Sequence, residues 1–250
     1  MNPFSLAGRV ALVTGANTGL GQAIAFALAE AGADIIAVGR TEPDETQRAV
    51  DKLGRRFLSI HADLGDTGTI PGVVQTALAE LGHVDILVNN AGIIRRNDAV
   101  DFTEADWDAV LDVNLKSVFL LTQAVGRHML QAGRGKVINM ASMLSFQGGI
   151  RVASYTASKS AVAGLTRLLA NEWAAKGVNV NAIAPGYFAT ANTSALRADE
   201  ARSRDILARI PAGRWGQPAD IGGAAVFLAA PASDYVHGAI IPVDGGWLAR

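Results

Sequence analysis

Short runs of apolar residues recur along the chain, and a segment with helical periodicity follows most of them. The runs do not alternate between polar and apolar positions, which is typical of strands buried on both faces of a parallel sheet. We expect strands at residues 9–13, 34–38, 57–60, 85–88, 136–140, 178–183 and 239–243. We expect helices over residues 20–31, 44–53, 72–81, 104–130, 155–176 and 221–229. This repetition predicts an α/β fold, a doubly wound parallel sheet with helices on both faces.

No sequence feature divides the chain into separate units. Its 250 residues suffice for one large domain, and we see no linker, repeat or low-complexity tract. We therefore expect a single domain over residues 1–250. The least regular segment, 186–212, is too long for an ordinary loop, so it is a candidate lid over a substrate site.

Charge and composition argue against several classes of function. The net charge is −1 and no basic run is present, so we expect no nucleic-acid or membrane partner. The absence of cysteine excludes disulfides, thiolate metal sites and a cysteine nucleophile, and it fits a reducing compartment. The four histidines lack metal-ligand spacing. The start has no signal-peptide pattern, and no apolar segment reaches the roughly 18 residues that span a bilayer. We expect a soluble, cytoplasmic protein.

The first apolar run leads directly into a glycine-rich turn, after which a helix begins at about Leu20. Glycines let the backbone approach a pyrophosphate, and a helix N-terminus offers unpaired amides and a positive dipole end. The spacing is Gly-x-x-x-Gly-x-Gly, which differs from the commoner Gly-x-Gly-x-x-Gly, and a purely structural turn is the alternative. We expect a nucleotide to be held by Gly15, Asn17, Thr18, Gly19, Leu20 and Gly21.

The ends of the next three strands should complete the nucleotide site. Gly39-Arg40 stands where a carboxylate would favour NAD, and Arg40 is either a partner for a 2′-phosphate or a solvated surface charge. Asp63, followed by Leu64, is placed to accept a hydrogen bond from an adenine amino group. Small residues that let the chain pass close to a ribose follow the fourth strand, at Asn90, Ala91 and Gly92, although turn chemistry alone would also explain them. The predicted cofactor is therefore NAD or NADP.

Tyr155 and Lys159 are four residues apart in a predicted helix, so they share one face. A free tyrosine has a pKa of about 10, and a nearby ammonium lowers it. The phenol can then exchange a proton with a substrate oxygen, which Ser142 at the end of the fifth strand can also bind. Tyr-x-x-x-Lys alone is often a surface pair. Its combination with Ser142 and the glycine turn predicts hydride transfer between a nicotinamide and a carbonyl or alcohol.

These motifs, in order and at this spacing, resemble those of the short-chain dehydrogenase/reductase family. The resemblance covers nearly the whole chain and is carried by Thr14-Gly-x-x-x-Gly-x-Gly21, Asn89-Asn-Ala-Gly92, Asn114, Ser142, Tyr155-x-x-x-Lys159 and Pro185-Gly186. It implies a Rossmann-like sheet of about seven strands and usually a homotetramer.

The same resemblance implies a role for each motif residue. Tyr155 would be the catalytic acid and base, and Lys159 would bind the nicotinamide ribose and lower the tyrosine pKa. Ser142 would hold the substrate oxygen, and Asn114 would anchor a water-mediated proton relay to the lysine. The nicotinamide end would be bordered by Pro185, Gly186 and Thr190.

Longer stretches at 142–152, 196–200, 209–216 and 243–250 are similar to bacterial members of the family that act on deoxy sugar acids. This implies interconversion of keto and hydroxy groups in uronate, pectin or alginate breakdown. Because a sugar acid carries a carboxylate, we expect this group to bind Arg95, Arg96 or Arg151. The alternative for each arginine is a solvent-facing charge. The alternatives are a gluconate 5-dehydrogenase, a 3-oxoacyl carrier-protein reductase, or a dinucleotide-binding protein without turnover.

Overall fold

A computed structural model describes residues 2–250, and within them seven strands form one parallel sheet. The order across the sheet is β3-β2-β1-β4-β5-β6-β7. The strands are β1 (Val10–Thr14), β2 (Asp34–Gly39), β3 (Phe57–His61), β4 (Ile86–Asn89), β5 (Gly135–Met140), β6 (Val178–Pro185) and β7 (Ile240–Val243). The order reverses between β1 and β4, as in a doubly wound sheet. The predicted α/β fold is confirmed.

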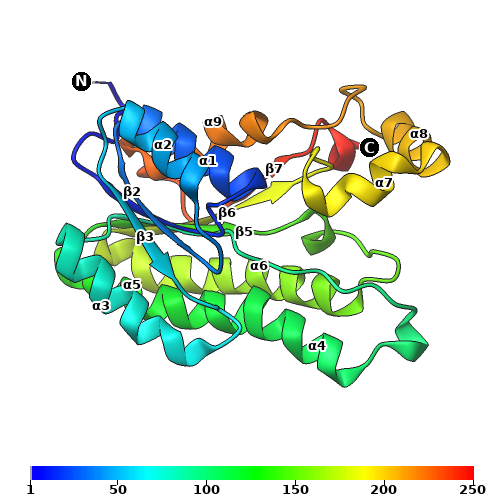
Figure 1. The fold of residues 1–250 in the computed structure, drawn as a ribbon, viewed down its shortest axis with the longest axis horizontal. Helices are drawn as coiled ribbons and strands as arrows, with labels where there is room; N and C mark the ends of the chain where they lie inside the picture. The colour runs from blue at the N-terminus through cyan, green and yellow to red at the C-terminus, as the bar shows by residue number, and fades with distance from the viewer. Residues whose placement is uncertain (1) are drawn as a thin grey trace.

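Helices cover both faces of the sheet, as Figure 1 shows. One face carries α1 (Gly19–Glu30), α2 (Asp44–Lys52) and α9 (Gly222–Ala229). The other carries α3 (Ile70–Leu81), α4 (Glu104–Leu111), α5 (Ser117–Ala132) and α6 (Ala153–Trp173). Two short helices, α7 (Ser194–Ala198) and α8 (Glu200–Arg209), lie beyond the carboxyl ends of the strands.

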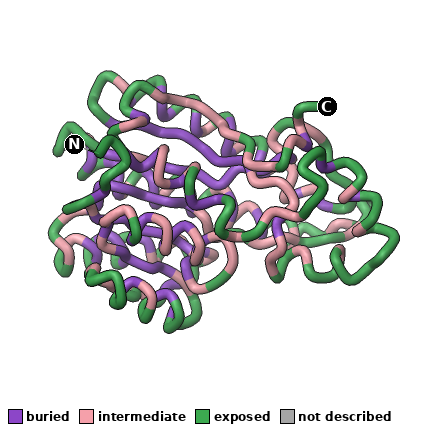
Figure 2. The backbone as a smooth tube through the Cα atoms, turned by 90° about the horizontal axis from the view of Figure 1, so that it is seen from above, coloured by how far each residue is buried: buried purple, intermediate pink, exposed green. Residues whose placement is uncertain are grey.

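Each central strand contributes side chains to two separate cores. On β1, Ala11 and Val13 pack with α1 and α9, whereas Val10 and Leu12 pack with the helices of the opposite face. Figure 2 shows the result as a buried layer between exposed helix surfaces. Burying one such aliphatic side chain stabilises the fold by roughly 1.5–3 kcal/mol. Because the inner residues of β1 and β2 are buried on both faces, these two strands read as apolar runs.

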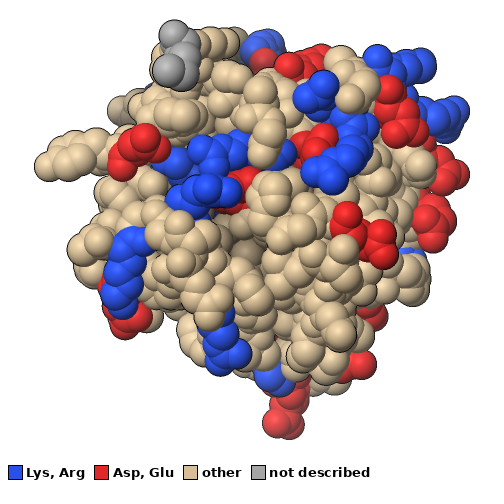
Figure 3. Space-filling model, turned by 90° about the vertical axis from the view of Figure 1, so that its left-hand side faces the viewer, with Lys and Arg blue, Asp and Glu red and all other residues tan. Residues whose placement is uncertain are grey.

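The amino edge of the sheet is joined by a buried carboxylate. The Oδ1 atom of Asp85 accepts hydrogen bonds from Arg9 (3.2 Å) and Arg134 (3.1 Å). Its Oδ2 atom accepts from the Val10 amide (3.1 Å) and lies 3.0 Å from His83. Figure 3, which views the molecule from the left-hand side of Figure 1, shows basic and acidic side chains interspersed on this face. The starts of β1, β4 and β5 are therefore held together at the edge opposite the cleft described below.

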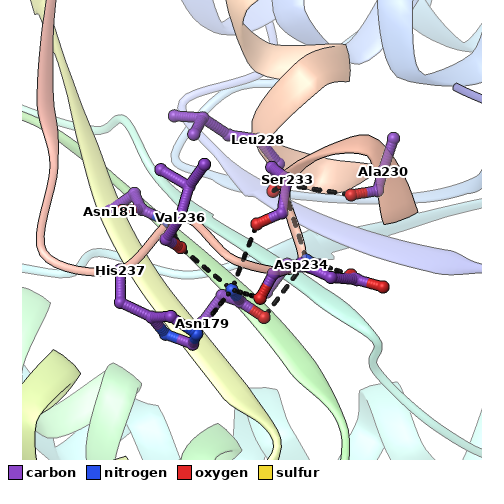
Figure 4. Close-up of polar contacts among 9 residues, drawn as sticks. Asn179, Asn181, Leu228, Ala230, Ser233, Asp234, Val236 and His237 are labelled. Carbon is purple, nitrogen blue, oxygen red and sulfur yellow. Dashed lines mark hydrogen bonds and ion pairs between the residues drawn. The ribbon is translucent and has the colours of Figure 1, made fainter. Parts of the chain in front are cut away.

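The edge strand β7 is held in place by asparagines of β6 (Figure 4). Asn179 donates to the backbone carbonyls of Ser233 (3.2 Å), Asp234 (3.0 Å) and Val236 (2.9 Å). Asn181 donates to Val236 (2.8 Å) and accepts from the amide of Ala239 (2.9 Å). These bonds fix the turn before β7 and, through that strand, the position of the chain's last residues.

Two segments differ from the sequence expectation. The helix expected over 104–130 is interrupted by a π-helical turn at Asp112–Lys116. The segment 186–212, for which no regular element was predicted, contains α7 and α8. Single-sequence patterns missed these helices because they are short and mostly exposed.

Within residues 2–250, one helix has the length and mean hydropathy of a membrane span, although its sequence contains no unbroken apolar run of about 18 residues. The continuous helix Glu104–Ala132 includes an 18-residue window with a mean hydropathy of 1.2. The apolar face of its α5 portion, including Leu121, Val125 and Met129, packs into the core beneath the sheet. That packing accounts for its composition.

A buried chain of polar side chains ties the sheet to α5 and α6. Asn89 donates to Thr122 and to Asn139 (2.8 Å each). Asn139 donates to Thr166 (2.9 Å), which donates to the Val162 carbonyl (2.8 Å). All four side chains are almost fully buried. The chain fixes α6, which carries Tyr155 and Lys159, against the ends of β4 and β5.

Replacing Asn139 with leucine should leave Asn89 and Thr166 short of a partner inside the core. We expect the free energy of unfolding to fall by about 2 kcal/mol or more, because unsatisfied buried polar groups retain their desolvation cost. Urea unfolding followed by circular dichroism measures this. Asn171→Leu on the exposed face of α6 is the matched control and should change stability by less than about 0.5 kcal/mol. Equal effects of the two substitutions would contradict the role of the chain.

Candidate active site

The carboxyl ends of the strands border a cleft of about 1140 Å³. Its walls come from the glycine-rich turn, the ends of β2 to β6, the segment containing α7 and α8, and the C-terminal turn. It spans the point where the strand order reverses between β1 and β4, which is where ligands bind in doubly wound folds.

The glycine-rich turn forms a close-fitting cradle at the start of α1. Gly15 (φ 66°) and Gly19 (φ 60°) have left-handed backbone conformations that other residues adopt only with strain. A Cβ at Gly21 would collide with the Gly15 carbonyl and the Asn90 amide. Thr18 makes no side-chain cap, and the first turn of α1 holds no acidic residue. The helix amides therefore remain available to an anion.

Thr14 and Asn90 lock this cradle to the end of β4. The Thr14 hydroxyl accepts hydrogen bonds from the amides of Asn90 and Ala91 (2.9 Å each). The Asn90 side chain donates back to the carbonyls of Thr14 (2.8 Å) and Gly15 (3.3 Å). Thr14 belongs to the glycine-turn motif but was not predicted as a site residue. Its role depends on the pairing of β1 with β4, which the sequence does not show.

At the ends of β2 and β3, Arg40 and Asp63 face each other across the cleft wall. Their closest oxygen and nitrogen atoms are 3.9 Å apart, and both side chains are more than half exposed. Asp63 also accepts from the Gly65 amide (2.9 Å). Gly39, Arg40, Asp63 and Leu64 all line the cleft, as predicted for the adenosine end.

Ser142, Tyr155 and Lys159 converge at the other end of the cleft. Ser142 follows β5 and caps a short turn through its hydroxyl, which accepts from the Leu144 amide (3.1 Å). Tyr155 and Lys159 lie on the first turns of α6, and the Lys159 ammonium nitrogen is 5.6 Å from the centre of the Tyr155 ring. Lys159 donates to the Met140 carbonyl (2.6 Å). The predicted i, i+4 arrangement is present.

The electrostatics of this trio differ from the sequence expectation. Burial lowers the pKa of Lys159 to about 8. Burial raises the pKa of Tyr155, while the neighbouring Ser142 hydroxyl and the positive charge of Arg96 act to lower it. Lys159, which was expected to lower the Tyr155 pKa, instead directs its amine to Met140. The residue pattern could not reveal this, because it does not show which hydrogen-bond acceptors lie within reach of the buried amine.

Asn114 sits within the π-helical turn and is fully buried. Its side chain accepts from the Ile93 amide (2.8 Å) and donates to the Ile93 carbonyl (2.9 Å). The Asn114 side-chain amide is thus bonded to the backbone of the loop that follows Gly92. π-Turns are frequent at functional sites.

The remaining predicted residues border the cleft between its two ends. Thr190 faces the glycine turn, since its methyl carbon would lie 3.7 Å from a Cβ built on Gly19. Gly186 allows close backbone packing, because a Cβ there would lie 2.5 Å from Cα of Asp244. Pro185, Gly186 and Thr190 all line the cleft.

The three arginines proposed for a carboxylate have different surroundings. Arg95 pairs with Asp106 (3.2 Å), and Arg151 pairs with Asp98 (3.1 Å). Arg95 and Arg96 line the cleft, whereas Arg151 lies outside its lining. Arg151, which was also expected to meet the carboxylate, precedes the start of α6 and has φ 63°.

The substrate end of the cleft also contains residues that the sequence did not single out as site residues. Ile206 and Arg209 reach it from α8, Gln147 from the turn after Ser142, and Trp247 from the C-terminal turn. Trp247 is almost fully buried. No local motif marks these residues, which lie up to one hundred positions apart.

Lys159 gives the site a measurable pH signature. Between pH 8 and 10.5 the unfolded lysine still binds a proton that the folded one has largely lost, so the free energy of unfolding should rise with pH. The full rise is about 3 kcal/mol for this pKa difference. Lys159→Met should remove it, whereas Lys176→Met, at an exposed position, should retain it. Urea unfolding from pH 7.5 to 10.5 measures the difference, and parallel curves for wild type and Lys159→Met would contradict the burial effect.

Comparison with known proteins agrees with this geometry. Residues 15–248 match the family model described as enoyl-(acyl carrier protein) reductase. The chain is 62% identical to the 2-dehydro-3-deoxy-D-gluconate 5-dehydrogenase of Escherichia coli (strain K12), over 100% of this chain and 99% of that protein.

Two solved structures extend the comparison to the fold. A putative 2-deoxy-D-gluconate 3-dehydrogenase from Agrobacterium tumefaciens with bound NADP is 62% identical, with a TM-score of 0.92 and full coverage of both chains. A gluconate 5-dehydrogenase from Burkholderia cenocepacia in complex with NADP and tartrate is 41% identical, with a TM-score of 0.95, over 100% of this chain and 98% of that one. Sequence, motifs and fold agree over the whole length, so this chain belongs to the short-chain dehydrogenase/reductase family.

Proposed function

We propose that this protein is a cytoplasmic NAD(P)-dependent oxidoreductase that interconverts a keto and a hydroxy group of a deoxy sugar acid. The reaction it fits best links 2-dehydro-3-deoxy-D-gluconate with its 5-keto form. The proposal rests on one observation: a single cleft contains Tyr155, Ser142 and Lys159 at one end and the glycine-rich cradle at the other. The full-length identity of 62% to a 2-dehydro-3-deoxy-D-gluconate 5-dehydrogenase points to the substrate class.

The residues of the cleft fit a nicotinamide dinucleotide. The cradle of Gly15, Gly19 and Gly21 leaves no room for a Cβ at Gly21, and the free amides of α1 suit a pyrophosphate. Arg40 at the adenosine end suits a 2′-phosphate, so NADP is admitted beside NAD. When bound, the nicotinamide supplies or accepts the hydride.

Tyr155 handles the proton that accompanies this hydride. In the direction of reduction, the substrate carbonyl carbon gains a hydride and its oxygen gains the Tyr155 proton, which yields the hydroxy group. Burial keeps the phenol protonated before the reaction, while Arg96 and Ser142 favour the phenolate left behind. Ser142 orients the substrate oxygen, and Lys159, held by the Met140 carbonyl, borders the same space. In oxidation the proton returns to Tyr155.

Arg96 is the residue we assign to the substrate carboxylate. Arg95 and Arg151 are already paired with Asp106 and Asp98. Arg96 lines the cleft, and it lies close enough to Tyr155 for its charge to lower the phenol pKa. A carboxylate bound there would lie near the reacting end of the cleft, as a six-carbon acid requires.

We also retain two proposals about the assembly. Segment 186–212 acts as a lid, supported by the many cleft-lining residues it contributes from Tyr187 to Arg209. The protein forms a homotetramer, supported by an apolar hollow on α5 and α6 with exposed Phe119 and Leu168. Light scattering tests the second proposal, and a mass below four chains would contradict it.

The substrate proposal is tested with a panel of purified ketones and both reduced cofactors. We expect the wild-type protein to reduce the 5-keto form of 2-dehydro-3-deoxy-D-gluconate, and to reduce 5-keto-D-gluconate less efficiently. Tyr155→Phe should lower kcat by about a hundredfold or more, because the proton donor is lost. Reduction of 3-oxoacyl thioesters but not of sugar acids would refute the proposal.

Arg96→Met should lower kcat/KM for the sugar acid about 10- to 100-fold, mainly by raising KM, because a charge-assisted hydrogen bond is lost. A neutral ketose should lose much less, because only the effect of Arg96 on the Tyr155 phenolate remains for a substrate without a carboxylate. Arg151→Met, which removes a charge outside the cleft lining, is the control and should change kcat/KM less than about twofold. An equal effect of the two substitutions would remove the assignment of Arg96.

Arg40 should decide the ratio of the two cofactors. We expect Arg40→Ala to lower kcat/KM for NADPH about tenfold or more and to leave NADH nearly unchanged, because only the 2′-phosphate pairs with the guanidinium. Fluorescence titration of NADPH gives the same comparison without turnover. NADPH bound equally well by wild type and variant would rule this role out.

A further inference from the structure

Trp247 is held deep in the protein although only three residues follow it. Its exposed fraction is 4%. The backbone turns inward at Gly245 (φ 65°) and Gly246 (φ 90°), conformations that glycine adopts without strain. The Asp244 carboxylate accepts hydrogen bonds from the amides of Gly246 (2.8 Å) and Leu248 (2.9 Å). This C-terminal turn lies beside α7 and α8 in Figure 1.

Neighbouring side chains fix the orientation of the indole. The Tyr187 ring meets it at 62°, with ring centres 4.8 Å apart. The Arg209 guanidinium carbon from α8 lies 3.9 Å from the ring centre, a cation–π contact. Met143, Ile206 and Ile210 pack in the same apolar cluster. A ring held in this way can direct its single N–H toward one partner only.

That partner is the side-chain oxygen of Gln147, which accepts from Trp247 Nε1 at 3.3 Å. Because indole nitrogen is only a donor, the Gln147 oxygen must face it, and the NH₂ group must face away. Within residues 2–250, no hydrogen bond uses this NH₂ group. The backbone amide of Gln147 donates to the Met143 carbonyl (3.2 Å), in the turn that begins at Ser142. Both Gln147 and Trp247 line the cleft.

We propose that Gln147 is a specificity-determining residue that donates a hydrogen bond to a substrate oxygen other than the reacting carbonyl and the carboxylate. Trp247 is the positioning residue that orients it. This inference rests on the proposed function and deepens it. A hydroxy or keto oxygen of a sugar acid satisfies the donor, whereas an aliphatic keto acid leaves it unpaired. Sites built to hydrogen-bond an oxygen discriminate strongly against analogues that lack it.

Two substrates separate this role from a structural one. The 5-keto form of 2-dehydro-3-deoxy-D-gluconate offers the extra oxygens, and 5-oxohexanoate offers the same ketone and carboxylate without them. We expect Gln147→Leu to lower kcat/KM for the sugar acid about tenfold, mainly through KM, and to change the value for 5-oxohexanoate less than about twofold. Where turnover of 5-oxohexanoate is too slow, its inhibition constant replaces kcat/KM.

Trp247→Phe keeps an aromatic ring at this position but replaces the indole with a smaller phenyl ring, which has no N–H. We expect about a threefold loss for the sugar acid alone, and no further loss when it is added to Gln147→Leu, because the two residues act through one bond. The control Gln75→Leu, on the exposed face of α3, should leave both substrates unaffected. The NADPH dissociation constant should stay near wild type in all variants, and so should the melting temperature, except in Trp247→Phe, where the smaller ring leaves a cavity in a buried cluster.

Equal losses on both substrates, or additive losses in the double variant, would overturn the inference. The inference would also fail if Gln147→Leu left the ratio of kcat/KM for the two substrates unchanged. That result would count against Gln147 alone if the wild type reduces the sugar acid and Arg96→Met reduces it much less efficiently, as the proposed function requires. A wild type that does not reduce the sugar acid at all would instead refute the proposed function.

Discussion

Parallel pairing of the seven strands is the constraint on which the rest of this structure depends. It places every carboxyl end at one edge, so residues from the ends of β1 to β6 share a single cleft. It also buries both faces of the sheet, which leaves that edge as the place where unpaired backbone and polar side chains meet solvent. The Asp85 cluster at the opposite edge and the Asn139 chain within the core keep the strands and α6 in register with each other.

Burial, rather than a single ion pair, dominates the electrostatics of the chemical end. It lowers the pKa of Lys159 and raises that of Tyr155, so it shifts both groups toward their neutral forms. The groups that act in favour of the phenolate are Ser142, which follows β5, and Arg96, from the loop that follows β4. A site arranged in this way keeps the phenol proton in place until a substrate oxygen is present to take it. In the proposed reaction, Arg96 would contribute both to binding of the carboxylate and to proton transfer.

The two ends of the cleft are built differently. The cofactor end comes from consecutive strand–helix units, and its key contacts, such as Thr14 with Asn90, join neighbouring strands. The substrate end is assembled from the turn after β5, from α8 and from the last residues of the chain. The asparagines of β6 are important for the second group, because they hold the turn before β7 and therefore the C-terminal turn that carries Trp247.

The sequence by itself determined the fold class, the phosphate cradle and the Ser142, Tyr155 and Lys159 group, because each depends on local spacing. Glycine conformations, strand burial and the i, i+4 spacing on a helix are properties of a few consecutive residues. Tertiary structure alone decided the pairing of Arg151 with Asp98, the Lys159 bond to Met140 and the contact of Gln147 with Trp247. Those depend on which distant segments meet and on how much water remains between them, and one-dimensional spacing records neither.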